Sequence, residues 1–214
     1  MKSQQSKDTL KKFLTINRKL HIHLGLFLVL FIWLFFVSGL IIHHGEWNFA
    51  KFYEKRVESK TNFIIAFGYI HDDPEMVDRV KEQLKIVGEV SNLQFKEGNI
   101  DFRVSSPGLL QEVHIDSHTG IGVIKVMKYN FWGKLRGLHT FNGMDKTNPS
   151  ISPNWFVTKL WRIMMDVTAI LLIILCIGSW VMWYKVRKDY KWGYVLFGLG
   201  IIISGYYMFV LDLL

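Results

Sequence analysis

The sequence predicts an α-helical membrane protein with three transmembrane helices and a small extracytoplasmic α/β domain inserted between the first two. Two observations carry this prediction. The chain of 214 residues is 50% hydrophobic and 15% aromatic, which is too apolar for an ordinary soluble domain of this size. Its apolar residues also fall into three long blocks, and a helix needs about 20 such residues to cross the hydrocarbon core of a bilayer.

The three blocks have the length of transmembrane helices. Residues 24–42, 167–184 and 192–211 contain no charged side chain. The first block follows a basic segment, as a secretory signal does, but the apolar part of a signal runs for only about 7–15 residues and ends in small residues. We therefore interpret the first block as a retained anchor.

The distribution of charge predicts the orientation in the membrane. The first 19 residues hold six Lys or Arg and one Asp, and residues 185–191 hold four Lys or Arg and one Asp. Because positive charge favours the cytoplasmic side, we expect a bacterial inner-membrane protein with its N-terminus in the cytoplasm and its C-terminus outside. Residues 45–154 hold 14 basic and 14 acidic residues, so the net charge of +8 does not indicate a nucleic-acid partner.

These observations divide the chain into seven segments. We predict a cytoplasmic basic tail (1–19), a first transmembrane helix (20–44), an extracytoplasmic α/β domain (45–129), an interfacial amphipathic helix and loop (130–154), a second transmembrane helix (155–184), a cytoplasmic link (185–191) and a third transmembrane helix (192–214).

The hydrophobic period changes several times within the α/β domain. Residues 62–67 are a plausible strand. Asp73-Pro74-Glu75 is typical of a helix start, and a helix of about 14 residues is expected to follow. Its apolar face is Val77, Val80, Leu84 and Val87. Four alternating segments, separated by turn sequences, then predict strands joined by hairpins. These segments are 90–96, 99–104, 110–116 and 120–126.

The segment from 130 to 152 has a different pattern. It carries an apolar stripe of Phe131, Trp132, Leu135, Leu138 and Phe141. We expect an amphipathic helix that lies at the outer membrane interface. The alternative is a helix packed onto the α/β domain.

Several motifs resemble one known family. Residues 18–25 (Arg-Lys-Leu-His-Ile-His-Leu-Gly) resemble the opening helix of PepSY-associated transmembrane proteins, in which a basic residue and a His precede a Gly, and Ser38-Gly39-Leu40 fits the other end. Residues 113–120 (Val-His-Ile-Asp-Ser-His-Thr-Gly) resemble the closing PepSY hairpin, and residues 135–139 (Leu-Arg-Gly-Leu-His) resemble the Leu-His element ahead of the second span. The likeness covers nearly the whole chain.

The resemblance implies that residues 45–129 form a PepSY-like domain. Larger members of the family have four or more spans and include siderophore and iron-chelate reductases that carry haem in the membrane. With three predicted spans, this chain looks like a short branch of the family.

Histidines at the ends of the first span are candidate haem ligands, because ligating side chains near apolar spans are costly and often functional. His21 and His43 share a helix face about 33 Å apart. The predicted topology puts His43, His44 and His139 on the same side, which would permit two imidazoles to bind one b-type haem. Alternatively, these histidines are interfacial residues bonded to backbone or lipid headgroups.

A second polar feature is the pair of Arg162 and Asp166, which are four residues apart in the second span. They are either a proton-handling carboxylate with its partner or a self-neutralising pair at the interface. Cys176 is the only cysteine, so no intrachain disulfide can form. The sequence shows no nucleophile with a nearby base and no phosphate-binding Gly-rich loop, which disfavours a hydrolase.

Two functions remain open. In the first, the helices anchor a binding or regulatory domain that contacts an envelope protein, in the cell envelope or in metal uptake, and homo-oligomers are possible. In the second, the chain is a haem-binding electron-transfer protein, and any enzyme activity is that of a haem-dependent oxidoreductase.

Overall fold

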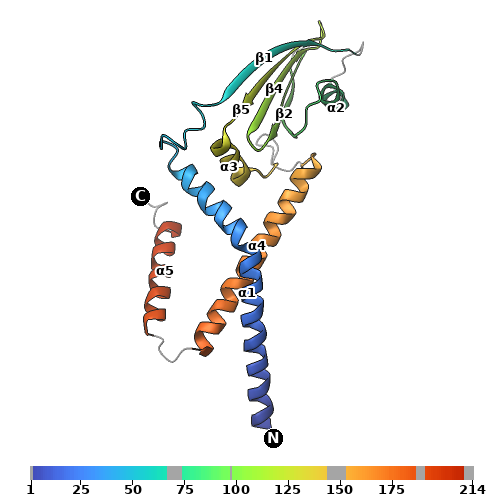
Figure 1. The fold of residues 1–214 in the computed structure, drawn as a ribbon. Helices are drawn as coiled ribbons and strands as arrows, with labels where there is room; N and C mark the ends of the chain where they lie inside the picture. Colours follow the sequence, from blue (N-terminus) through green and yellow to red (C-terminus); the bar gives the residue numbers. More distant parts are fainter. Residues whose placement is uncertain (1, 67–73, 97, 144–152, 187–190, 210–214) are drawn as a thin grey trace. The chain divides into compact units, whose positions relative to one another are not determined.

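The computed structural model describes residues 2–66, 74–96, 98–143, 153–186 and 191–209 (Figure 1). The chain divides into two compact units. One combines its two ends, up to Leu28 and from Ala169, and the other is the stretch Val29–Thr168.

Three helices are long and apolar enough to cross a membrane. They are α1 (Lys2–His43), α4 (Phe156–Val186) and α5 (Lys191–Phe209). Only 17%, 11% and 0% of their most apolar windows is buried within the protein, so most of these side chains need another apolar medium. A lipid bilayer supplies that medium, and the three helices therefore suggest a membrane protein.

The predicted basic tail is not separate from the first helix. Helix α1 begins at Lys2 and continues to His43 without a break, so residues 2–19 of the predicted tail belong to it. The reason is local, because this stretch is rich in Lys, Gln and Leu, which favour helix, and it lacks Gly and Pro.

In the first unit, polar contacts join the early part of α1 to the late part of α4. The Asn17 side-chain amide donates to the carbonyl oxygen of Gly178 at 2.9 Å. A Cβ at position 178 would lie 2.8 Å from Asn17 Oδ1, so glycine permits this approach. Aromatic contacts join α4 to α5, between Trp180 and Phe197 and between Trp183 and Tyr194.

The second unit contains a five-stranded antiparallel sheet. Its strands are β1 (Val57–Ile64), β2 (Glu89–Lys96), β3 (Asn99–Ser106), β4 (Leu109–Asp116) and β5 (Ile121–Lys128), in the order β1-β5-β4-β3-β2. The four strands predicted to form hairpins are confirmed. The strand predicted at 62–67 begins five residues earlier and ends at Ile64, because its pairing with β5 starts at Val57 opposite Lys128.

One face of the sheet carries the hydrophobic core. Helix α2 (Pro74–Gln83) lies on this face (Figure 1). The buried side chains of the core are Ile65, Met76, Val77, Val80, Ile86, Ile100, Phe102, Val104, Val113, Ile115 and Ile124. The core residues on β3 and β4 occur at every second position of each strand, because successive side chains of a strand point to opposite faces.

The prediction of a 14-residue α2 was wrong at its C-terminus. The helix ends at Gln83, and Lys85 adopts a positive φ of 52°. The Ile86 amide donates to the Lys81 carbonyl at 2.8 Å, which is the bond that closes a helix whose next residue is left-handed. Val87, predicted to face the core, is therefore 63% exposed.

Helix α3 (Phe131–Thr140) packs between the end of α1 and the β3–β4 turn. Leu135 is buried with Ile41 and Ala50. On another side of the helix, a Cβ at Gly137 would lie 3.2 Å from the backbone nitrogen of Gly108, so the backbone of α3 is in close contact with that of the β3–β4 turn. The helix therefore contacts the sheet domain, and residues 144–152 of the predicted amphipathic segment lie outside the described residues.

Truncation of Phe102 should destabilise the sheet domain far more than truncation of Val87. Phe102 is 2% exposed, so Phe102→Ala should lower the free energy of unfolding by about 3–5 kcal/mol. Val87→Ala should change it by less than about 0.5 kcal/mol. Pulse proteolysis in urea of the full chain in detergent micelles measures both values, and equal effects would contradict the core described here.

Candidate functional site

The face of the sheet opposite α2 is polar. Side chains that alternate with the core residues point to this side, and we call it the open face. It is defined by Lys60, Asp101, Arg103, Glu112, His114 and Lys125. Arg103, Glu112, Lys125 and Lys60 lie opposite one another on β3, β4, β5 and β1, so they form one row across four strands.

Charges on the open face pair across the strands. Arg103 Nε lies 3.0 Å from Glu112 Oε1, and His114 Nδ1 is bonded to Asp101 Oδ1. Glu58 accepts from Arg56, and this hydrogen bond, together with the charges of Arg56 and Lys125, lowers the pKa of the Glu58 carboxyl. These side chains are partly exposed, and such pairs contribute little net stability.

The open face has two hollows. One, of about 450 Å³, lies over the middle of the sheet between Lys60 and Arg103. The second, of about 380 Å³, lies between α3 and the adjoining ends of β2 and β3, and we call it the α3 pocket. Asn92 and Arg103 line both hollows, so the two adjoin each other.

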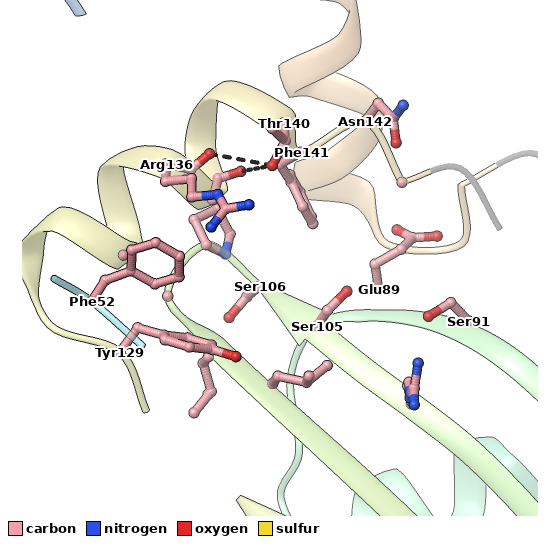
Figure 2. Close-up of a pocket in the computed structure, with 18 of the residues that line it drawn as sticks. Phe52, Glu89, Ser91, Ser105, Ser106, Tyr129, Arg136, Thr140, Phe141 and Asn142 are labelled. Carbon is pink, nitrogen blue, oxygen red and sulfur yellow. Dashed lines mark hydrogen bonds between the residues drawn. The ribbon is translucent and has the colours of Figure 1, made fainter. Parts of the chain in front are cut away.

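Figure 2 shows the α3 pocket. Arg136 and Phe52 lie near one end, Glu89 and Ser91 near the other, and Ser105 and Ser106 between them. The Arg136 guanidinium carbon is 4.5 Å from the centre of the Phe52 ring, a cation–π contact that leaves the edge of the guanidinium available for hydrogen bonds.

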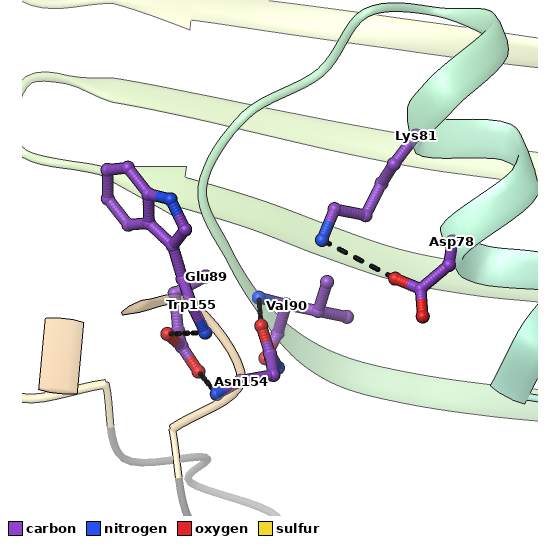
Figure 3. A network of polar contacts seen from close by, with 6 residues as sticks. All are labelled: Asp78, Lys81, Glu89, Val90, Asn154 and Trp155. Atoms are coloured by element: carbon purple, nitrogen blue, oxygen red, sulfur yellow. Dashed lines mark hydrogen bonds and ion pairs between the residues drawn. The ribbon is translucent and has the colours of Figure 1, made fainter. Parts of the chain in front are cut away.

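Glu89 joins the sheet to the start of α4. Its side chain is buried, with 3% exposure. Its two carboxylate oxygens accept from the backbone amides of Asn154, at 2.7 Å, and Trp155, at 3.0 Å (Figure 3). The Trp155 carbonyl accepts a hydrogen bond from the Lys159 amide, so Trp155 is the N-cap residue of α4. The Glu89 carboxylate therefore also lies at the positive end of the helix dipole.

Asn154 adds a second tie to the same strand. Its side chain accepts from the Val90 amide and donates to the Val90 carbonyl, both at 3.1 Å. The Asn154 amide group thus occupies both backbone groups of Val90 on the edge of the sheet. Four hydrogen bonds in total hold the beginning of β2 to the beginning of α4.

His139, one of the predicted haem ligands, lies against α1. Its Nδ1 is 2.7 Å from the hydroxyl oxygen of Ser38, which is fully buried. Its Cε1 is 3.6 Å from the position of a Cβ on Gly39, and its ring meets Phe35 edge to face. The small residues Ser38 and Gly39 therefore allow α3 to approach α1 closely.

The other histidines have separate surroundings. His43 and His44 contact each other edge to face with ring centroids 4.8 Å apart. The His44 ring also stacks on the Trp47 ring, and its Nδ1 is hydrogen-bonded to Glu46 Oε1 at 3.2 Å. In the first unit, His21 Nδ1 lies 3.5 Å from the Ser179 hydroxyl.

These positions do not fit a haem bound between α1 and α3. A haem with two axial imidazoles needs a slot for the macrocycle between the two rings. The ring of His139 rests directly on α1, so no such slot separates His139 from that helix. Haem ligation by His43, His44, His139 or His21 stays a prediction of the sequence, and no reaction step is derived from it.

Arg162 and Asp166 are both exposed on α4. Within the described part of the chain, no ion pair joins them within 4.0 Å. Their role as a self-neutralising or proton-handling pair stays a prediction.

The contacts that organise the site were not predicted from the sequence. Glu89 read as the last residue before a strand, and Asn154 as part of a loop. One signal was present, because Asn-Trp directly before a long apolar helix is typical of a helix N-terminus. The long-range partner of that N-terminus, 65 residues away, leaves no periodic trace.

Fold and site together describe a chain with three candidate membrane spans, which suggest a membrane protein, and one antiparallel sheet domain that has an open polar face. Comparisons with protein-family models, curated proteins and solved structures found no match.

Removal of the Glu89 carboxylate should free the start of α4. Glu89→Ala removes the acceptor of two partly buried hydrogen bonds and should lower the free energy of unfolding of the sheet domain by about 1–3 kcal/mol. Glu89→Gln keeps one acceptor and should cost about half as much. Glu82→Ala, at an exposed position on α2, is the matched control. Hydrogen exchange at Asn154 and Trp155 should accelerate only in the Glu89 variants. Equal acceleration in Glu82→Ala would contradict the role of Glu89 in holding the start of α4.

Haem ligation can be tested by absorption. If the histidines bind haem, protein purified in detergent from haem-replete cells shows a Soret band. That band is lost when His139→Ala is combined with His43→Ala or His44→Ala. A spectrum without the band contradicts the ligation.

Proposed function

We propose that this chain is a bacterial inner-membrane protein whose sheet domain lies outside the cytoplasm and binds a protein of the cell envelope through its open face. The helices anchor that domain in the membrane. The resemblance to PepSY-associated proteins supports this assignment, and it fits a regulatory role in the envelope or in metal uptake.

The open face is the observation that carries the proposal. An antiparallel sheet can pack one face on the core and leave the other in solvent, where its polar side chains are accessible to a partner. Here one face is covered by α2, whereas the other exposes a row of charged side chains, three basic and one acidic, and two adjoining hollows. Complementary charges of this kind give a partner its register and orientation.

Charge also supports the orientation. The basic residues concentrate in residues 1–19 and 185–191, and the domain between the first two spans is neutral. This distribution is typical of a cytoplasmic N-terminus and an exported domain.

Topology gives the first test. A phosphatase reporter inserted after Gly98 or Gly120, in two turns of the sheet domain, should be active, since this enzyme folds only outside the cytoplasm. A fluorescent reporter fused before Lys2 should be active in the cytoplasm. The opposite pattern would overturn the proposed orientation.

Site-specific cross-linking tests the binding face. Benzoylphenylalanine in place of Lys60, on the open face, should give one adduct of defined mass in intact cells. The same probe in place of Arg79, exposed on α2, should give none. Lys125→Glu reverses a charge in the same row and should reduce the Lys60 adduct several-fold. Adducts of equal yield from both positions, or none from position 60, would contradict the proposal.

A further inference from the structure

We infer that the α3 pocket binds a small anionic molecule through its carboxylate or phosphate group, with Arg136 as the cation that receives it. This inference rests on the proposed binding role of the sheet domain and names a ligand class for one part of its open face.

The charges in the α3 pocket point to an anion. Three charged side chains line it, and two are engaged. Glu89 uses both oxygens on backbone amides, and Arg103 pairs with Glu112. Within the described residues, Arg136 has a ring contact with Phe52 and no acidic partner. Among the described residues, no acidic side chain therefore neutralises this positive charge in the pocket.

Other groups in the pocket suit an oxyanion. Hydroxyl groups of Ser91, Ser105, Ser106 and Tyr129 line it, and hydroxyls can donate to carboxylate or phosphate oxygens. The planar guanidinium of Arg136 matches the geometry of both groups. The volume of about 380 Å³ lies in the range of small-molecule pockets.

Two other occupants fit less well. No group of three His, Cys, Asp or Glu side chains that could hold a metal ion occurs in the described parts of the chain. An extended peptide would add to the edge of β2, but Asn154 already occupies both backbone groups of Val90 there. A small anion needs neither feature.

The walls of the pocket connect to two helices. Glu89 lines the pocket and holds the start of α4. On the opposite wall, Arg136 and Thr140 flank His139, which is bonded to Ser38 of α1. An anion bound by Arg136 and by the serine hydroxyls near Glu89 links these walls, so it should slow hydrogen exchange of the Trp155 amide.

Phosphate binding tests the inference. Full-length protein in phosphatidylcholine nanodiscs should bind radiolabelled inorganic phosphate saturably in equilibrium dialysis. Arg136→Gln should weaken binding about tenfold or more, the loss expected for a charge-assisted hydrogen bond. Arg136→Lys should recover part of it. Lys134→Gln, with the same charge change on α3 outside the pocket lining, should weaken binding less than about twofold.

Each outcome bears on the inference. If phosphatidylglycerol in the nanodiscs abolishes phosphate binding by the unmodified protein, the site takes a lipid headgroup; if binding persists, it takes a soluble anion, and either result supports the site. Binding that does not saturate, or equal losses in Arg136→Gln and Lys134→Gln, overturns it. Unchanged exchange at Trp155 on saturation overturns the connection to α4. Cross-linking from position 60 without phosphate binding rejects this pocket alone and leaves the proposed function standing.

Discussion

The buried carboxylate of Glu89 is the interaction on which the arrangement of the sheet domain depends. A charge that is 3% exposed is stable only when its oxygens are satisfied, and here the backbone amides of Asn154 and Trp155 satisfy them. The same two bonds provide acceptors for the amides of the two residues directly before α4. The same two hydrogen bonds thus satisfy both the carboxylate oxygens of Glu89 and the backbone amides of Asn154 and Trp155. The first residue of β2 and the two residues before α4 are held together as a result.

The strict alternation of the strands explains why the sheet has one apolar and one charged face. Ile100, Phe102 and Val104 point to α2, and their neighbours Asp101 and Arg103 point away. Because the period of a strand is two, a shift of register by one residue would move charges into the core. The core therefore fixes the row of charges on the open face. Binding specificity and folding stability depend on the same register.

Local signals predicted most of the fold. Apolar length predicted the three long helices, and alternation with turn glycines predicted β2 to β5 within two residues at each end. Prediction failed where a local signal was weak or absent. Lys85 adopts a left-handed conformation usually taken by glycine, so the end of α2 was misplaced and Val87 was assigned to the core. The site depended on contacts across long sequence distances, such as Glu89 with Trp155 and Ser38 with His139, which periodicity cannot reveal.

The two edges of the sheet differ in a way that matters for assembly. On β2, Asn154 covers Val90, and an irregularity between Ser91 and Gln94, with Asn92 at a φ of 54°, disturbs the pairing pattern. On β1, eight residues pair regularly with β5, and no other described strand pairs with its outer edge. Of the two edges, β1 is therefore the one at which a further strand has room to pair, so the sheet would grow on that side. Glu58 and Lys60 are charged residues on this edge, and charges there disfavour edge-to-edge pairing with strands of other molecules. A strand that pairs with β1 would need charges complementary to these two.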